Sequence, residues 1–231
     1  MASIRFPDPR QAGDDGLLAV GGDLRPETLL AAYRAGIFPW PIEGWPLTWF
    51  SPKERAVLLF DELHVPRRLA RERRRTPLRF TIDQDFRGVI EACARARRPE
   101  GPGTWITAAM IRGYCELHRR GHAHSVEAWE GDTLAGGLYG VDADGAFSGE
   151  SMFYRRANTS KLALLFLVEH LRGRGLGWLD VQQLTPHMRA LGAREVGRET
   201  FLGMLAATRR RGLKLFPTPQ ARMKEEGGRM K

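Results

Sequence analysis

Three polar residues, Glu150, Asp180 and Gln182, stand in segments that otherwise resemble apolar β-strands. Glu150 falls between Phe147 and Met152, and Asp180 and Gln182 alternate, so that both would point to the same face of a sheet. A carboxylate in the middle of an apolar sheet is costly unless it is paired or functional. These residues could therefore move a proton or bind a cationic group. The alternative is a structural ion pair, with a partner among Arg155, Arg156 and Lys161.

Two further motifs favour ordinary structural roles. His118, His122 and His124 have no carboxylate or thiolate at ligand spacing and no HExxH pattern, so we expect no metal site. The string Arg172–Gly177 (R-G-R-G-L-G) resembles the loop that binds the coenzyme A pyrophosphate in acetyltransferases. It follows a helix, however, and the dipole of a helix C-terminus disfavours anions. We expect a simple turn there, which disfavours coenzyme A as the acyl donor.

The charge is basic and uneven over the 231 residues, with a formal net charge of +9. The densest run comprises Arg67, Arg68, Arg71, Arg73, Arg74, Arg75 and Arg79. Arginine clusters bind phosphate well, so the run indicates a nucleic acid partner. A solvated surface is an equal alternative, whereas an anionic membrane is disfavoured because the run has little apolar face of its own.

Nothing in the sequence indicates export or a membrane. The first residues lack the apolar segment of a secretory signal, and no apolar run approaches the roughly 18–20 residues needed to cross a bilayer. Cys93 and Cys115 are the two cysteines, without metal-binding spacing. We therefore expect a cytoplasmic protein.

The elements that must position the polar residues follow from hydrophobic periodicity and turn residues. We expect strands over residues 17–20, 56–60, 80–82, 123–129, 133–141, 146–154 and 178–181. We expect helices over residues 26–36, 64–74, 86–97, 107–120 and 200–211, and another that begins at Asn158 or Thr159. Residues 224–231 read as disordered.

The order of these elements predicts an α+β fold with a mixed sheet flanked by helices. Helices, an antiparallel meander and a strand–helix–strand crossover are the order of an acetyltransferase core of the GNAT type. We expect a small N-terminal α+β domain over residues 1–53 and a catalytic domain over residues 54–231. The first contains a proline-stiffened loop with Trp40, Trp45 and Trp49, which would form either a small core or a surface for stacking bases.

Several strings give the sequence a specific family resemblance. They are G-L-L-A-V-G-G-D-L (16–24), Y-R-A-G-I-F-P-W (33–40), W-F-S-P-K-E-R-A-V-L (49–58), G-T-W-I-T (103–107), Y-C-E-L-H-R-R-G-H-A-H-S-V-E-A-W (114–129), G-G-L-Y-G (136–140), G-E-S-M-F (149–153) and L-D-V-Q (179–182). Together they span nearly the whole chain except its C-terminal end. In these strings the sequence resembles the bacterial leucyl/phenylalanyl-tRNA–protein transferases.

The resemblance implies an enzyme that transfers Leu, and less efficiently Phe or Met, from aminoacyl-tRNA to proteins beginning with Arg or Lys. Such tagging marks proteins for N-degron proteolysis. The resemblance places the aminoacyl pocket at Leu138, Phe147, Met152 and Leu179. It places the site for the terminal adenosine and the acceptor protein at Tyr33, Phe38, Trp40, Trp105 and Tyr114. Glu150, Asp180 and Gln182 would form the catalytic group, and no cofactor is expected.

On this reading Asp180 accepts or orients the proton of the attacking α-amine, and Gln182 and Glu150 fix its geometry. Either carboxylate would help to recognise the Arg or Lys side chain, and the vicinal ribose hydroxyl is an alternative proton carrier. Arg67, Arg68, Arg71, Arg74 and Arg75 would contact tRNA phosphates, and we expect a monomer. Two alternatives stay open: a coenzyme A-dependent N-acetyltransferase for a cationic amine, and a non-enzymatic RNA-binding module.

Overall fold

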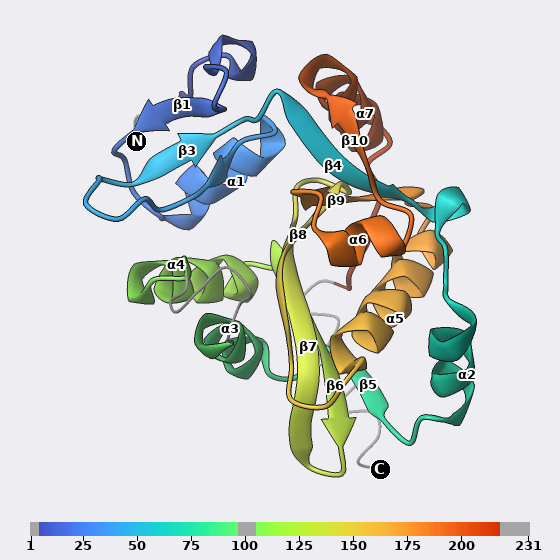
Figure 1. Ribbon diagram of the computed structural model, residues 1–231. Coiled ribbons are helices and arrows are strands. Elements are labelled where there is room, and N and C mark those ends of the chain that lie inside the picture. Colours follow the sequence, from blue (N-terminus) through green and yellow to red (C-terminus); the bar gives the residue numbers. More distant parts are fainter. Residues whose placement is uncertain (1–4, 97–104, 218–231) are drawn as a thin grey trace.

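The computed structural model describes residues 5–96 and 105–217. Within these residues the chain forms a small antiparallel sheet near its N-terminus and a larger mixed sheet (Figure 1). The small sheet has the strand order β1-β3-β2. Its part of the chain comprises η1 (Pro9–Gln11), β1 (Leu17–Val20), α1 (Pro26–Arg34), β2 (Phe38–Pro39) and β3 (Thr48–Phe50).

The larger sheet has seven strands in the order β10-β4-β9-β8-β7-β6-β5. They are β4 (Glu54–Leu59), β5 (Arg79–Ile82), β6 (Ala123–Glu130), β7 (Thr133–Asp142), β8 (Phe147–Tyr154), β9 (Trp178–Gln182) and β10 (Arg194–Gly197). All neighbours run antiparallel except β8 and β9, which are parallel and pair only at Ser148 and Asp180. The sheet therefore opens between β8 and β9 beyond this single pair.

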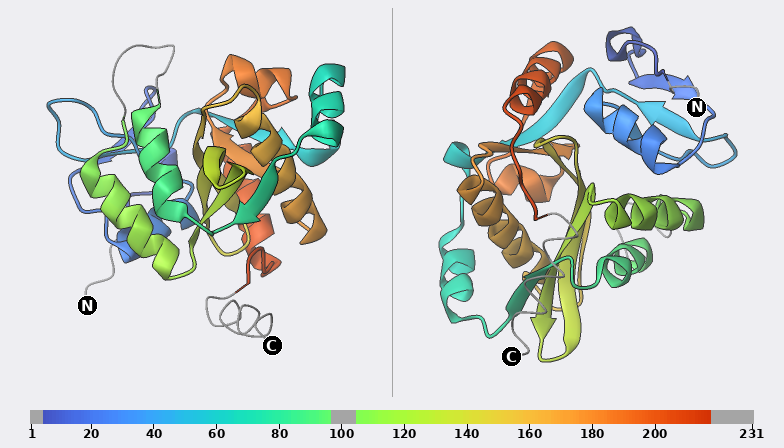
Figure 2. Two further views of the ribbon diagram at one scale, coloured as in Figure 1. Left: turned by 90° about the horizontal axis from the view of Figure 1, so that it is seen from below. Right: turned by 180° about the vertical axis from the view of Figure 1, so that it is seen from behind.

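Helices cover both faces of the larger sheet (Figure 1). They are η2 (Phe60–Glu62), α2 (Arg67–Arg75), α3 (Phe86–Arg95), α4 (Ala108–Arg119), α5 (Thr159–Gly173), α6 (Pro186–Ala190) and α7 (Arg198–Arg210). The three views agree that α5 and α2 lie on one side and α3 and α4 on the other (Figure 2). α1 packs on α4, and α7 lies beside β10 and β4. No helix among the described residues has the length and apolar character that a membrane span requires.

Two apolar clusters form the interior. One lies between α5 and the sheet and includes Leu138, Phe147 and Leu165. The other joins α1, α3 and α4 to the opposite face and includes Tyr33 and Tyr114. The N-terminal residues thus share a core with the larger sheet, which holds side chains from the two parts of the chain in fixed relation.

The expected α+β class, the mixed sheet, the flanking helices and the parallel strand–helix–strand crossover are all confirmed. The helix expected over 64–74 begins only at Arg67, after Pro66. The helix expected to begin at Asn158 or Thr159 begins at Thr159, with Asn158 at the N-cap position; the Asn158 side chain makes no capping bond, and its amide donates to Glu72 Oε2 at 2.7 Å. β2 and β3, which fall in the expected proline-stiffened loop, and α6 and β10 were not expected.

Two predictions lie wholly or partly beyond the described residues. Residues 224–231, which we expect to be disordered, lie outside the described residues. Residue 97, the predicted end of one helix, also lies outside them. The predicted domain boundary between residues 53 and 54 stays a prediction. The chain passes from the small sheet to the larger one between β3 and β4.

Candidate active site

A chain of hydrogen bonds runs from Gln182 through Glu150 to Tyr114 and Tyr33, at the opening between β8 and β9. The Gln182 amide Nε2 donates to Glu150 Oε1 at 2.5 Å, and the Tyr114 hydroxyl donates to Glu150 Oε2 at 3.1 Å. The Tyr33 and Tyr114 hydroxyl oxygens are 2.5 Å apart. Because Tyr114 gives its proton to Glu150, Tyr33 donates to Tyr114. Two of the three predicted catalytic residues are therefore in direct contact.

Strand irregularities aim these two side chains. Gly149 pairs with Gly140 and Ser151 with Tyr139, which leaves Glu150 as the extra residue of a β-bulge. A second irregularity lies between Asp180 and Gln182, and Gln182 has φ of 61°. Bulges redirect side chains and concentrate near active sites. The second bulge also interrupts the simple alternation that the sequence predicts for Asp180 and Gln182.

The surroundings of Glu150 raise the pKa of its carboxyl into the neutral range. Burial raises the pKa of the Glu150 carboxyl from 4.5 to about 7, against the hydrogen bonds from Tyr114 and Gln182, which lower it. The charge of nearby Asp180 raises it further. Burial also raises the pKa of the Tyr33 and Tyr114 hydroxyls well above the usual range, so both remain donors. Glu150 can thus exchange a proton near neutral pH.

Asp180 lies in a different environment, in a buried ion pair. Arg55 Nε donates to Asp180 Oδ1 at 2.8 Å, and Arg55 Nη2 donates to Oδ2 at 2.7 Å. Ser148 Oγ donates to Oδ2 at 2.8 Å, and the Gln182 backbone N–H donates to Oδ1 at 3.0 Å. A carboxylate has about four acceptor positions, and these four bonds use them. Asp180 is 1% exposed and Arg55 is 2% exposed.

Sequence analysis missed Arg55 as the partner of Asp180. Of the arginines it named, Arg156 pairs with Glu130 and Arg155 donates to the Leu134 carbonyl. Arg55 follows the charged residues Lys53 and Glu54 at the start of an apolar run, so its sequence context does not single it out. The strand pairing could not be read from one sequence.

A cleft of about 350 Å³ adjoins Gln182. Its lining includes the aromatic residues Phe38, Trp40 and Phe50, the exposed carboxylates Asp15, Glu54 and Glu195, and Gln182 itself. Glu150 lies directly behind Gln182, through their hydrogen bond. The cleft therefore combines an aromatic wall, a negative rim and a hydrogen-bonded group at its base.

The residues predicted for the adenosine and the acceptor gather in one cluster. Trp40 and Trp105 stack with ring centroids 5.2 Å apart, and Phe38 packs edge-on against Trp40 at 6.5 Å. The rings of Tyr33 and Tyr114 are buried, and their centroids are 6.4 Å apart. Phe38 and Trp40 line the cleft, whereas the two tyrosines reach the site through their hydroxyls.

The residues predicted for the aminoacyl pocket also lie together. Leu138, Phe147 and Leu179 are buried in the apolar cluster beneath α5, and the half-buried Met152 packs against it. Leu138 and Met152 are direct neighbours across β7 and β8. The structure thus brings the four side chains to one apolar region, on β7, β8 and β9.

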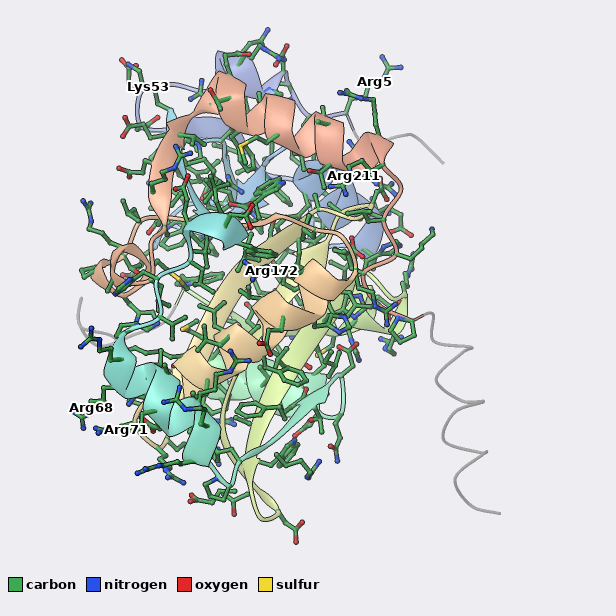
Figure 3. The ribbon with its side chains drawn as sticks, turned by 90° about the vertical axis from the view of Figure 1, so that its right-hand side faces the viewer. Arg5, Lys53, Arg68, Arg71, Arg172 and Arg211 are labelled. Atoms are coloured by element: carbon green, nitrogen blue, oxygen red, sulfur yellow. The ribbon has the colours of Figure 1, made fainter. Side chains whose placement is uncertain are left out.

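The five arginines predicted to contact tRNA are all exposed on α2. Arg68, Arg71 and Arg75 line a depression of about 280 Å³, together with Arg156. Arg68 and Arg71 extend away from the ribbon into solvent (Figure 3). None of the five forms an ion pair within the described part of the chain. Arg73, by contrast, pairs with Glu169.

His118 and His124 have structural hydrogen-bond partners. His124 Nδ1 is 2.8 Å from Asp83 Oδ2, and His118 Nδ1 is 2.8 Å from the Ala123 carbonyl. Asp83 is a carboxylate near both histidines that the sequence spacing did not reveal. In residues 5–96 and 105–217, no group of three or more His, Cys, Asp or Glu side chains is arranged to hold a metal ion.

Comparison with known proteins identifies related sequences over most of the chain. The family model for leucyl/phenylalanyl-tRNA protein transferase matches residues 57–206, and the model for its N-terminal domain matches residues 22–53. A leucyl/phenylalanyl-tRNA–protein transferase of Anaeromyxobacter dehalogenans is 54% identical over 201 residues, which are 87% of this chain and 86% of that protein. One from Desulfatibacillum aliphaticivorans is 48% identical over 220 residues, which are 95% and 92% of the two chains.

Proposed function

The chain belongs to the leucyl/phenylalanyl-tRNA protein transferase family of aminoacyltransferases, and on that premise we propose its substrates and mechanism. It transfers leucine, and also phenylalanine and methionine, from aminoacyl-tRNA to proteins whose first residue is Arg or Lys. The tagged proteins then enter N-degron proteolysis. The observation that carries the proposal is the contact between Gln182, in the wall of the cleft, and Glu150 behind it.

The proposed reaction is aminolysis of an activated ester. The α-amino nitrogen of the acceptor protein attacks the ester carbonyl carbon, the new peptide bond forms, and the ester C–O bond to the terminal adenosine breaks. The nitrogen loses a proton and the ribose oxygen gains one. The ester supplies the driving force, so the protein needs to align two substrates and needs no cofactor.

Glu150 is our candidate for the proton acceptor. Its carboxyl has a pKa of about 7 because of burial, close to the roughly 7.7–8.0 of an α-amine. Asp180 is held by Arg55, Ser148 and the Gln182 backbone, which leaves it no acceptor position for an incoming proton. We therefore propose that Asp180 acts through Gln182, which differs from both roles that the sequence predicts for it, accepting or orienting the proton of the α-amine.

The same cleft accounts for the choice of acceptor protein. Asp15, Glu54 and Glu195 give it a negative rim, which favours a peptide with a cationic first residue. Gln182 is 5% exposed and donates its amide hydrogen to Glu150, which leaves its Oε1 as an acceptor for the ammonium or amine of the peptide.

The aminoacyl-tRNA is proposed to approach with its terminal adenosine on the aromatic wall. Stacking on an aromatic side chain contributes roughly 1–3 kcal/mol per base, and Trp40 presents such a ring to the cleft. The amino acid side chain would enter the apolar region formed by Leu138, Phe147, Met152 and Leu179. A flexible methionine there suits unbranched or γ-branched side chains, whereas a β-branched one would clash near its Cβ.

The exposed arginines of α2 are proposed to bind the phosphates of the tRNA. Arg67, Arg68, Arg71, Arg74 and Arg75 are free of ion pairs within the described residues, so their charge is available to a polyanion. The contact would be independent of sequence, because phosphates carry no base identity.

Transfer of radiolabel tests the proposal. The protein is incubated with labelled Leu-tRNA and a peptide beginning with Arg, Lys or Ala. We expect label on the Arg and Lys peptides and none on the Ala peptide. Acetylation of the peptide by acetyl-CoA without tRNA would support the N-acetyltransferase alternative instead. RNA binding without any transfer would support a binding module.

A further inference from the structure

The guanidinium group of Arg55 is enclosed by three separate parts of the chain. It projects from β4, and its carbon Cζ lies 4.5 Å from the ring centroid of Phe38 and 4.6 Å from that of Phe201. Phe38 belongs to β2 in the small sheet, and Phe201 to α7. Arg55 Nη1 also approaches the Gly36 carbonyl, at 3.4 Å. The two rings therefore sandwich a planar cation whose remaining edge faces Asp180.

The contact passes from Arg55 to the candidate active site through Asp180. Asp180 Oδ1 accepts from both Arg55 Nε and the Gln182 backbone N–H. That second bond spans the turn in which Gln182 has φ of 61°, a backbone conformation that is costly for a residue other than glycine. The same turn places the Gln182 amide on Glu150. Arg55, Asp180 and Gln182 are buried, and Gln182 carries the contact to the half-buried Glu150.

We propose that Arg55 is a positioning residue for aminoacyl transfer: it fixes Asp180, which holds the Gln182 turn and so aims the Gln182 amide at Glu150 and the cleft. The inference rests on the proposed function, since it concerns the rate of that reaction. The same guanidinium supports Phe38, which lines the cleft, so one residue sets both the aromatic wall and the polar base. It also ties the small sheet and α7 to the catalytic strands.

Only arginine meets these requirements. Its planar fork reaches both carboxylate oxygens at once, while its faces stack on two rings. Lysine would keep the charge but could neither bind both oxygens nor stack as a plane. The alternative is that the pair only stabilises the fold. Buried ion pairs often contribute little net stability, and a well-packed apolar pair can replace them. An apolar pair should therefore restore stability if the ion pair only stabilises the fold, but it should not restore the rate if Arg55 positions Gln182.

The test compares Arg55→Lys, Arg55→Met and the double variant Arg55→Met/Asp180→Leu with the wild type. Single-turnover transfer of leucine from Leu-tRNA to an Arg-starting peptide is measured with enzyme in excess, beside the melting temperature. A loss of folded enzyme lowers the amplitude of the reaction, whereas a misplaced Gln182 lowers its rate constant. Arg209→Met is the matched control, because Arg209 pairs with Asp144 and bonds the Arg34 carbonyl away from the cleft.

We expect Arg55→Lys to lower the single-turnover rate constant about 100-fold, the cost of roughly 1 Å of misplacement. The double variant should regain melting temperature but not rate, and Arg209→Met should keep the rate. A wild-type rate constant in Arg55→Lys would overturn the inference. Recovery of both the rate constant and the melting temperature in the double variant would also overturn it. If Arg55→Met does not fold, the double variant still provides this comparison. An inactive wild type would instead refute the proposed function.

Discussion

Gln182 donates its side-chain amide to Glu150 across the opening between β8 and β9, at 2.5 Å from Nε2 to Oε1. The bond joins a residue in the cleft wall to a carboxyl that is hydrogen-bonded on its far side to Tyr114. Both residues lie at strand irregularities, and the parallel strands beside them pair at one position only. The site therefore arises where the regular sheet is interrupted.

The first prediction concerns the rate of transfer in Glu150→Gln. Loss of the proton acceptor should lower the single-turnover rate about 100-fold or more, the contribution usual for general base catalysis. Glu127 is a matched control: it is buried and bonds Ser125 and Thr81, remote from the cleft lining. Glu127→Gln should keep the rate within about twofold. Equal rates in wild type and Glu150→Gln would remove Glu150 from the reaction.

The second prediction concerns stability against pH. Folding raises the pKa of Glu150 from 4.5 to about 7, so the folded state binds the proton more tightly than the unfolded state. Its stabilising contribution is full below about pH 4.5 and is lost as the pH rises to about 7. Glu150→Gln should therefore be more stable than the wild type at pH 8, by up to about 3 kcal/mol. Denaturant unfolding at pH 4.5 and pH 8 measures this difference, and a gap that does not widen with pH would contradict it.

The third prediction concerns the aromatic wall. Trp40→Ala should weaken binding of an aminoacyl-adenosine analogue by roughly 1–3 kcal/mol, while Trp40→Phe should retain most of it. Trp45 is the natural control, because it belongs to the same loop, is 57% exposed and does not line the cleft. Calorimetric titration of the three variants gives the affinities. A larger loss in Trp45→Ala than in Trp40→Ala would place the adenosine elsewhere.

The fourth prediction concerns phosphate contacts on α2. Changing Arg68, Arg71 and Arg75 to Gln should weaken tRNA binding and flatten its salt dependence by roughly 0.7–0.9 per lost contact. Arg87 and Arg95 on α3 already pair with Glu91, so the same change there should leave the slope intact. Binding is measured between low and moderate salt. An unchanged slope in the triple variant would exclude this helix from the tRNA contact.

The fifth prediction concerns the choice of amino acid. Met152 is the half-buried member of the proposed pocket, so Met152→Ala enlarges it with less damage to the core than changes at Leu138 or Leu179. The ratio of Phe to Leu transfer should rise several-fold, since one or two methylene groups are worth about 1–3 kcal/mol in such pockets. Competition between labelled Leu-tRNA and Phe-tRNA measures the ratio; an unaltered ratio would place the pocket elsewhere.

Much of the fold could be predicted because its signals are local. Asp85 and Thr107 cap α3 and α4 as ordinary N-cap residues, and the turns of the β6–β8 meander have typical hairpin residues. α6 and β10 were missed because neither buries an apolar face: no residue of α6 is buried, and β10 is exposed except at the half-buried Val196. The start of α5 at Thr159 was predicted, but the contact of the Asn158 amide with the distant Glu72 was not.

The sequence identified candidate residues of the site but not the contacts among them. Isolated charges in apolar strands revealed Glu150 and Asp180, yet the bulges that turn Glu150 toward Tyr114 leave no pattern in a single sequence. Arg55 and Asp180 are 125 residues apart and meet only because β4 and β9 are neighbours. That pairing decides which carboxylate is free to act and which is held.

A structure of the protein with a non-hydrolysable aminoacyl-adenosine bound tests the central claim most directly. The claim predicts the adenine against Trp40 and the amino acid side chain beside Met152. The carbonyl carbon should lie beside Gln182 and Glu150, where the α-amino nitrogen of an acceptor peptide would be about 3–3.5 Å from it. An analogue whose carbonyl carbon lies away from Gln182 and Glu150 would contradict it.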